Sequence, residues 1–500
     1  MQMELTLIQV DPLDNAAVAL RDLPPGLTVS VSGRAYRTAE PIPFGHKMAL
    51  ADMKRGTDVI KYGAPIGHTT TDVQAGQWLH SHNVATNLEG LLEYRYEPVS
   101  GREADCDGLP ADFEGYRRPD GRVGTRNELW IIPTVSCVNR TVQRISETAG
   151  RRGIQAGDGI RAYPHNAGCS QLGDDHETTQ KLLANIIKHP NAGGVLLVSL
   201  GCENNDLEHF LPVLGSYDPS RIRTMVCQDV KGDEVEEGLR LIKEIAVVMA
   251  QDRRETVAVE HLAVGFKCGG SDAFSGITAN PLCGRISDFI TGLGGTAVLT
   301  EVPEMFGAET QLMNRADSAQ TFEKIVDMIN AFKQYYIRHG QPIYENPSPG
   351  NKKGGITTLE EKSLGCIQKG GQATVTDTLE MGEVCRRPGL NLMTGPGNDS
   401  VSVTNLLASQ AQILLFTTGR GNPLGTAIPT IKIASNSLLF NNKPNWMDFD
   451  AGVVVDHGDI DSAARALWRL VLDVASGRRH TKSEENDDRE IMIFKDGVIL

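Results

Sequence analysis

The chain has 500 residues, of which 40% are hydrophobic and 22% charged, and its formal net charge is −14. This composition excludes a disordered or fibrous chain, and the acidic balance argues against a broad surface for nucleic acid or anionic lipid. The first residues, "MQMELTLIQVDPLDN", lack a secretory signal pattern, and no apolar run approaches the ~18 residues of a membrane span. A cytoplasmic protein is therefore expected.

Residues 1–97 predict a small β-rich domain, because short strand-like runs alternate there with Gly and Pro turns. A polar linker is predicted over residues 98–115. The domain contains His46 and the pair His80 and His82 in "HSH". If that pair lies in a strand, both imidazoles share one face and suit a divalent metal with a third ligand. Two solvated histidines are the alternative.

The pattern of hydrophobic residues changes beyond the linker. Apolar runs of strand length alternate with amphipathic stretches of helix length, which predicts two α/β domains with mainly parallel sheets, over residues 116–255 and 256–500. Several strands end in polar or thiol-bearing loops, and ligands of open parallel sheets bind beyond the carboxyl ends of the strands. These loops should carry the following side chains to one face, unless the thiols merely fill the core: Cys137, Cys202, Cys268, Glu301 and Glu304.

The stretch "PHNAGCSQLGDDH" gathers potential acid–base groups ahead of a predicted helix. Asp174 or Asp175 is the expected N-cap of that helix. His165 and His176 are left over, and histidine is the side chain best placed to exchange a proton near neutral pH.

Two later segments predict ligand contacts. The long irregular stretch from Glu345 to Cys366 has the character of a lid or binding loop, and Lys352 within it could attract a carboxylate. Arg420 lies in a glycine loop after the strand "QILLF", with Lys432 downstream, and a guanidinium held in this way suits bidentate carboxylate recognition. An ordinary solvated loop is the alternative for the first segment.

The nine cysteines are scattered along the chain without a C-x-x-C pair, so reduced thiols are expected. The sequence also lacks the glycine-rich signatures of nicotinamide and nucleoside triphosphate sites and the G-x-S-x-G of serine hydrolases. Metal-assisted chemistry on a small anion remains.

Several stretches, in this order, resemble the altronate dehydratase family, which also includes galactarate dehydratase. They are "GHKMALADMKRGTDVIKYGAPIG", "HSHNVATNL", "GRVGTRNELWIIPTVSCVN", "GCSQLGDD", "HPNAGGVLLVSLGCENN", "CGGSDAFSGITANP", "TEVPEMFGAE", "IYENPSPGNKKGGITTLEEKSLGC" and "TTGRGNPLG". The resemblance covers essentially the whole chain. It implies a β-clip SAF-like fold for the N-terminal domain and a hydro-lyase that converts D-altronate to 2-dehydro-3-deoxy-D-gluconate in hexuronate breakdown.

The resemblance also implies a divalent metal, Fe(II) with Mn(II) as a substitute, and the "HSHN" motif favours altronate over galactarate. The expected metal ligands are His46, His80 and His82, with Cys169, Cys202, Cys268 and Cys366 as candidates to bind iron or line the pocket. The expected proton-transfer groups are His165, His176, Glu301 and Glu304, of which the glutamates are also candidate ligands. The expected substrate contacts are Arg420, Lys432, Lys352 and Asn204.

Three alternatives stay open at this point. The protein could be a lyase for galactarate or a sulfonated hydroxy acid, a sugar-acid sensor without turnover, or an iron–sulfur dehydratase with three cysteines on a cluster. No nucleic-acid or membrane partner is expected, and a homodimer is the default assembly.

Overall fold

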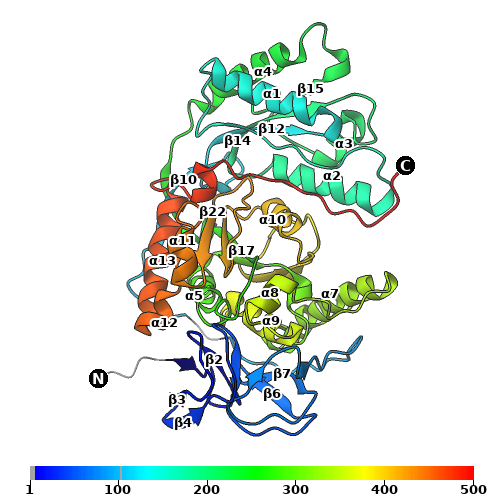
Figure 1. Ribbon diagram of the computed structural model, residues 1–500. Coiled ribbons are helices and arrows are strands. Elements are labelled where there is room, and N and C mark those ends of the chain that lie inside the picture. The colour runs from blue at the N-terminus through cyan, green and yellow to red at the C-terminus, as the bar shows by residue number, and fades with distance from the viewer. Residues whose placement is uncertain (1–5, 102–103) are drawn as a thin grey trace.

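The computed structural model describes residues 6–101 and 104–500, which form three bodies in a row (Figure 1). The N-terminal domain, in dark blue, lies at one end of the molecule. The second body of the chain, in cyan, lies at the opposite end, and the third body lies between them. The order in space therefore differs from the order along the chain, and the N-terminal domain contacts the third body.

The N-terminal domain consists of short antiparallel strands, which confirms the predicted β-rich domain. They form sheets in the orders β1-β2-β5-β8, β3-β4 and β6-β7-β9. In β3, Val29 and Val31 are buried whereas Thr28 and Ser30 are exposed, the alternation of a strand with one face on a core. The strands are β1 (Leu7–Ile8), β2 (Ala16–Ala19), β3 (Thr28–Val31), β4 (Arg34–Arg37), β5 (Lys47–Ala49), β6 (Asp58–Lys61), β7 (Ala64–Thr69), β8 (Trp78–Leu79) and β9 (Val84–Ala85).

The second body has a parallel sheet in the order β13-β12-β14-β15, with helices on both faces. Helices α1 and α4 cover one face, and α2 and α3 cover the other. The elements are β12 (Glu128–Pro133), α1 (Asn139–Arg151), β13 (Ile160–Ala162), α2 (Gly173–Ile187), β14 (Ala192–Ser199), α3 (Leu207–Leu214), β15 (Ile222–Val226) and α4 (Glu234–Met249). A small antiparallel sheet joins this body to the third; it consists of β10 (Asp112–Arg117), β11 (Val123–Gly124) and β16 (Glu255–Ala258).

The third body has a seven-stranded parallel sheet in the order β19-β20-β18-β17-β21-β22-β23. Its strands are β17 (Ala263–Cys268), β18 (Thr296–Leu299), β19 (Val375–Leu379), β20 (Gly389–Met393), β21 (Ile413–Thr418), β22 (Thr430–Ala434) and β23 (Phe449–Asp450). Its helices are α5 (Ala279–Gly292), α6 (Glu309–Met313), α7 (Ala319–Arg338), α8 (Pro349–Lys353), α9 (Leu359–Cys366), α10 (Asp399–Ala408), α11 (Ser437–Asn442), α12 (Val453–His457), α13 (Ile460–Ala475) and α14 (Lys482–Glu485). Short 3-10 turns cover Ser136–Val138, Cys227–Asp229, Val259–His261, Val302–Glu304 and Ile367–Gly370. The predicted α/β architecture with mainly parallel sheets is thus confirmed.

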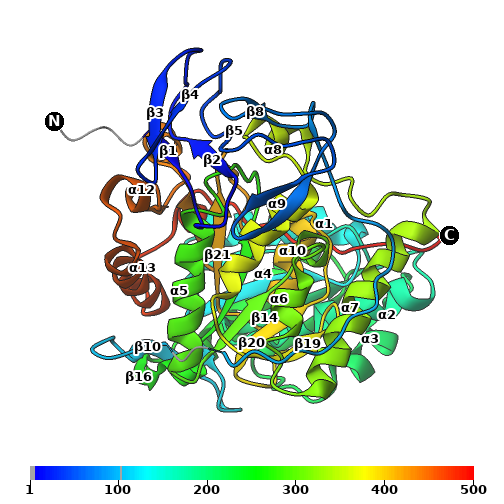
Figure 2. The ribbon, with the colours of Figure 1, turned by 90° about the horizontal axis from the view of Figure 1, so that it is seen from below.

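The connections of this sheet mark a crevice. From β17 the chain moves to β18 on one side of the sheet, and later returns to β21 on the other side of β17. Ligands of open parallel sheets bind at such a reversal, beyond the carboxyl ends of the strands. Cys268 is the last residue of β17 and Thr418 the last of β21, so the site is expected beside these two residues. Figure 2 shows α8 and α9 close to the N-terminal domain.

Helix α2 begins differently from the prediction. Its N-cap is Leu172, without a side-chain cap, so the expected capping role of Asp174 or Asp175 is wrong. Asp175 instead accepts hydrogen bonds from the backbone N–H groups of Asp496 and Gly497. The carboxylate therefore ties the C-terminal tail, drawn in red beside α2 in Figure 1, to the second body.

Two buried histidines predict acid sensitivity. Nδ1 of His189 accepts from Asn191 N–H, so its Nε2–H donates to the carbonyl of Ala411, 2.9 Å away in the third body. His165 is held in the same way between Ala167 N–H and the carbonyl of Pro133. Burial lowers the pKa of His165 to about 4 and that of His189 to about 3.

Since both pKa values are depressed, the unfolded chain binds more protons and stability falls as the pH drops below about 6.5. Because the unfolded chain is protonated at these positions at pH 5, each histidine should lower the free energy of unfolding by about 2 kcal/mol at pH 5 relative to pH 8. In His189→Gln the amide can still donate to the carbonyl of Ala411. Urea unfolding should show that the free energy of unfolding of this variant falls, between pH 8 and pH 5, by about half of the amount that the two histidines together cause in the wild type. An unchanged pH dependence in this variant would contradict the assignment.

Candidate functional site

Three ligand-type side chains meet just beyond β17. Cys268 Sγ lies 2.9 Å from Glu304 Oε2, Cys366 Sγ lies 3.1 Å from the same oxygen, and the two sulfurs are 3.4 Å apart. All three side chains are buried. They come from the end of β17, from the turn after β18 and from the end of α9. The fold therefore brings together residues that are almost a hundred positions apart in the sequence.

Buried lysines surround this group. Lys267 pairs with Glu301 and, at 2.7 Å, with Asp399. Lys362 Nζ lies 2.8 Å from Glu304 Oε1, and Lys369 Nζ lies 3.0 Å from Cys268 Sγ. We call the eight residues the buried cluster: Lys267, Cys268, Glu301, Glu304, Lys362, Cys366, Lys369 and Asp399.

The charges of the buried cluster favour a divalent cation. When Glu301, Glu304 and Asp399 are all ionised, the three lysines balance them, so each cysteine that ionises adds one uncompensated negative charge. Two thiolates would leave two such charges, which a divalent cation would compensate. Thiolates and a carboxylate suit first-row metals such as Fe(II), Mn(II) or Zn(II) better than Mg(II). The donor set Cys268, Glu304 and Cys366 therefore fits the metal that the sequence predicts.

The thiols and carboxyls of the buried cluster have displaced pKa values. The hydrogen bond from Cys366 lowers the pKa of the Cys268 thiol, assisted by the ammonium groups of Lys369 and Lys362, and the same bond raises the pKa of Cys366. Burial opposes ionisation of Glu304, but Lys362 and Lys369 outweigh it and lower its pKa. Burial, reinforced by the charges of Cys268 and Glu304, raises the pKa of Glu301.

Glu301 also has an unusual backbone. Its φ is +72° and its ψ is +61°, a left-handed conformation that costs a residue with a Cβ roughly 1–2 kcal/mol. Strain of this kind concentrates at functional sites. The turn aims the carboxyl at Lys267 and at the backbone N–H of Cys268, which donates to Glu301 Oε2 over 3.0 Å. The sequence prediction that Glu301 and Glu304 share a site with Cys268 agrees with this placement.

The expected metal histidines lie elsewhere, at the seam with the N-terminal domain. The rings of His46 and His80 are 4.9 Å apart, and the exposed His82 lies 5.0 Å from Trp78. Nδ1 of His46 accepts a hydrogen bond from Trp78 Nε1, so its only lone pair is engaged in this arrangement. Nδ1 of His80 lies 3.0 Å from Thr357 Oγ1.

The structure differs from the sequence expectations for these histidines in their local structure and in their distance from the buried cysteines. The condition that "HSH" lies in a strand is not met, because β8 ends at Leu79 and His80–His82 lie in the turn that follows it. Thr357 precedes α9 and Cys366 ends it, which separates the two ends by roughly 13 Å along the helix. One metal ion is therefore not shared between the histidines and the buried cysteines. Burial and the neighbouring Lys47 lower the pKa of His46, and the same causes lower that of His80 to about 4.

The predicted convergence of all strand ends on one face is wrong. Cys137 and Cys202 follow strands of the second sheet and are exposed, whereas Cys268 follows a strand of the third body. Cys202 contacts Gln228, and Cys169 contacts Asn204. Among the described residues, the group of ligand atoms that lie within 4.8 Å of one another contains two cysteines and a glutamate, Cys268, Cys366 and Glu304.

The remaining polar groups of the second body, among them the candidates His165, His176 and Asn204, have structural contacts or lie at the surface. Glu203 of "GCENN" accepts from the hydroxyls of Thr134 and Ser199 and from the backbone N–H groups of Leu200 and Gly201, so its carboxylate closes the loop. Both nitrogens of His165 are hydrogen-bonded to backbone. His176 is half-buried in the first turn of α2, and Asn204 is exposed and accepts from Ser170 N–H.

Of the three basic residues predicted to contact the substrate, the structure places Arg420 at the crevice. Arg420 is exposed in the loop after β21, and a Cβ built on Gly270 would lie 3.8 Å from its Cβ, so it stands at the crevice beside β17. Lys432 does not reach outward: its ammonium donates to the carbonyls of Asn422 and Leu424, and burial lowers its pKa to about 7. Lys352 is half-buried at the end of α8.

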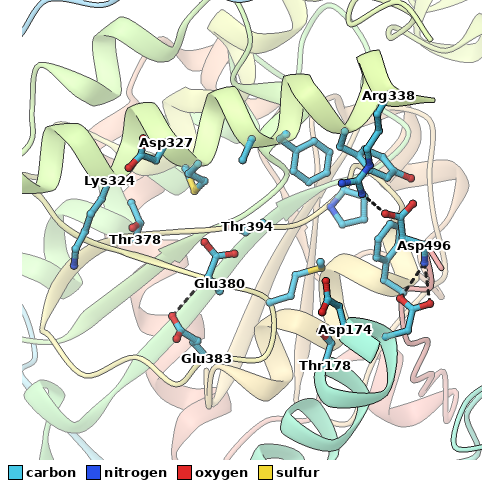
Figure 3. A pocket seen from close by; sticks show the side chains of 18 residues that line it. Asp174, Thr178, Lys324, Asp327, Arg338, Thr378, Glu380, Glu383, Thr394 and Asp496 are labelled. Carbon is cyan, nitrogen blue, oxygen red and sulfur yellow. Dashed lines mark hydrogen bonds and ion pairs between the residues drawn. The ribbon is translucent and has the colours of Figure 1, made fainter. Parts of the chain in front are cut away.

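A separate cavity of about 580 Å³ lies between α2, α7, β19 and the C-terminal tail (Figure 3). Acidic side chains dominate its charged lining, with Asp327, Glu380 and Glu383 against Lys324 and Arg338. An anionic substrate would be repelled there, so this cavity is not a site for a sugar acid.

Among the described residues, no helix combines the length and apolar composition that a membrane crossing requires.

Sequence reasoning missed the lysines of the buried cluster. Lys267 lies inside the strand run "HLAVGFKC", where a lysine between apolar neighbours already signals a buried charge with a partner. Lys362 and Lys369 lie four residues before and three after Cys366, which is the spacing of one helical face. Their partners on β17 and after β18 are distant in sequence, so their roles become visible only in the fold.

Comparison with known proteins gives matches along the whole chain. Residues 5–87 match the altronate/galactarate dehydratase SAF domain, residues 115–250 the second domain of D-galactarate dehydratase/altronate hydrolase, and residues 259–499 the C-terminal domain of D-galactarate/altronate dehydratase. The altronate dehydratases of Escherichia coli K12 and Bacillus subtilis 168 are 48% and 47% identical to the chain. Each match covers 99% of this chain, and 99% and 100% of the respective relative.

A two-subunit relative matches in pieces. The beta subunit of (2R)-sulfolactate sulfo-lyase of Chromohalobacter salexigens is 29% identical over 77% of this chain and 97% of its own length. The alpha subunit is 37% identical over 51 residues, which are 10% of this chain and 54% of that subunit. Since the family models follow one another from residue 5 to residue 499 and two relatives match end to end, the chain belongs to the D-galactarate/altronate dehydratase family.

Proposed function

We propose that this chain is a metal-dependent hydro-lyase that dehydrates D-altronate to 2-dehydro-3-deoxy-D-gluconate in hexuronate breakdown. The full-length match to two altronate dehydratases carries the proposal. The buried donors Cys268, Glu304 and Cys366 support its metal dependence, with Fe(II) as the metal and Mn(II) as a substitute.

The reaction needs help because the C2 proton of altronate lies next to a carboxylate that is already anionic. Loss of that proton and of the C3 hydroxyl as water gives an enol, which becomes the 2-keto acid. A bound divalent metal supplies Lewis-acid stabilisation of the charge that develops on the substrate oxygens. The protein must then position the substrate, take one proton and return one.

We assign these tasks to residues around β17. Arg420 stands exposed at the crevice and binds the substrate carboxylate. Glu301, aimed by its left-handed turn and held by Lys267, takes the C2 proton. Lys369, whose ammonium is 3.9 Å from Glu301, returns a proton to the departing hydroxyl. Asp399, which pairs with Lys267, has a third of its side chain exposed, so the buried cluster reaches the surface at this residue.

Anaerobic turnover by metal-stripped protein tests the proposal. D-altronate is supplied with Fe(II), Mn(II), Mg(II) or no metal, and the 2-keto acid is measured. We expect Fe(II) to restore turnover, Mn(II) to restore part of it, and Mg(II) to leave it at the metal-free level. Turnover that is equal with and without metal would contradict the metal dependence.

Galactarate is the second candidate substrate, because the family models name both acids. Faster turnover of galactarate in the same assay would reverse the assignment, and tight altronate binding without turnover would indicate a sensor. We also propose a cytoplasmic homo-oligomer, by default a dimer. The nine free cysteines support a reducing compartment.

A further inference from the structure

The N-terminal domain is held to the third body by a buried contact between charges. Lys47 and Lys61 reach Glu361 of α9 at 2.7 Å and 2.9 Å. Lys47 also donates to the carbonyl of Gly355 and the hydroxyl of Thr357, both at 2.8 Å. All three charged side chains are at most 1% exposed. Burying charges is unfavourable unless each is well paired, so the two surfaces must fit closely.

A second contact lies at the other end of α9. Tyr62 has a left-handed backbone, with φ +62°, and its hydroxyl enters a socket between two glycines. A Cβ on Gly276 would lie 2.4 Å from this oxygen, and one on Gly365 would lie 3.5 Å from it. Gly365 immediately precedes Cys366 of the buried cluster. The N-terminal domain therefore contacts α9 beside the donor that the helix supplies.

Helix α9 joins the two sites through consecutive side chains. Glu361 points to the N-terminal domain, whereas its neighbour Lys362 pairs with Glu304. Cys366, one turn further on, contacts the same glutamate. A shift of this short helix would move Lys362 and Cys366 together. The position in which the N-terminal domain docks on α9 therefore determines the positions of both side chains.

The covalent connection between the two parts is slight. Residues 89–93 are all exposed, while Tyr94 already bonds Glu309 of the third body. The seam combines these ionic groups with apolar contacts: the rings of Phe44 and Phe274 stack with centroids 4.7 Å apart, and Val18 packs against the same segment. A mixture of apolar and polar contacts is typical of interfaces between separate chains. The sulfo-lyase relative divides its sequence between two subunits, and its beta subunit matches most of this chain.

We propose that the N-terminal domain is a separable docking module, which needs no covalent link and which, through Glu361 on α9, positions Lys362 and Cys366. The positioning part rests on the proposed function, since it concerns the same site. Docking itself does not depend on that function and is measured without turnover.

The test starts from the full chain with a specific protease site in place of residues 89–93. After cleavage of the folded protein, we expect both pieces to elute together in gel filtration at about 0.15 M salt, near physiological ionic strength. Turnover of altronate should stay within twofold of the uncut protein, and alkylation of Cys366, followed by mass spectrometry, should stay as slow. Separation of the pieces, or lost turnover while they elute together, would overturn the proposal.

Variants then test the contact. Glu361→Gln leaves two buried lysines unpaired, and should release the N-terminal piece after cleavage and speed alkylation of Cys366 at least tenfold. Lys61→Met keeps the pair of Lys47 and Glu361, so it provides a second test if Glu361→Gln does not fold. We expect it to change the release of the N-terminal piece and the alkylation of Cys366 in the same direction but by less. Lys54→Ala, which breaks an exposed pair on the same domain, is the matched control and should change neither readout.

If both variants leave association and Cys366 protection at wild-type levels, the docking role of Glu361 is wrong. If the uncut protein never turns over altronate, the proposed function fails, while co-elution and alkylation still decide the docking module.

Discussion

Glu301→Gln is expected to lower kcat about 1,000-fold with little change in KM, because the amide cannot take the C2 proton that the carboxylate accepts. The substitution keeps the size of the side chain, and Lys267 retains Asp399 as an ionic partner. Steady-state kinetics with D-altronate and the preferred metal measure the effect. Metal content, determined by elemental analysis, should match the wild type, since Glu301 is not one of the three donors.

Glu309→Gln is the matched control. Glu309 is a buried glutamate of the same body, 2.8 Å from Lys333 and bonded by the Tyr94 hydroxyl, but it lies outside the buried cluster. We expect its turnover to stay within about twofold and its unfolding temperature to fall, because an unpaired buried lysine remains. Equal losses of kcat in both variants would mean that Glu301 acts through charge balance and not as the base.

Cys268→Ser and Cys366→Ser should each remove bound metal and reduce turnover by more than about 100-fold, a loss larger than that typical of residues behind the ligands. Serine keeps the shape of the side chain but offers a hard, protonated oxygen in place of a thiolate. After anaerobic loading and desalting, elemental analysis should find metal in the wild-type chain and only traces in the variants.

Cys283→Ser provides the control for changing a buried thiol. Cys283 lies on α5 in the same body and is fully buried, outside the donor group. Metal content and turnover should stay close to wild type. Full metal occupancy in both Cys268 and Cys366 variants would remove the buried cluster as the metal site and return attention to His80 and His82.

The sequence predicted the class of fold and part of the site. Strand ends gave Cys268, Glu301 and Glu304, because a buried apolar run that stops at polar residues marks the edge of a sheet. The same reasoning also included Cys202, since nothing in a strand-length run tells to which of two sheets it belongs. Only tertiary pairing of distant elements separates these groups.

The lysines show the other limit. Lys267 faces Glu301 and Asp399, which follow it by 34 and 132 positions, and such pairs have no local periodicity. The histidines show a related limit of sequence patterns. His80 and His82 have the spacing of a metal pair, but "HSHN" forms a turn because Asn83 bonds back to Trp78 and His80.

The left-handed turn at Glu301 has a consequence for protein engineering. Glycine adopts this conformation at lower conformational cost, by roughly 1 kcal/mol, and it would bury no carboxyl. A glycine would relax the backbone at position 301, but it would also remove the acceptor of the Cys268 backbone N–H and leave the buried Lys267 with Asp399 alone. Loss of a buried ionic partner costs about 3–5 kcal/mol, which exceeds this gain. Selection for heat resistance should therefore retain Glu301, and a stability screen at this position would not by itself discard the proton acceptor.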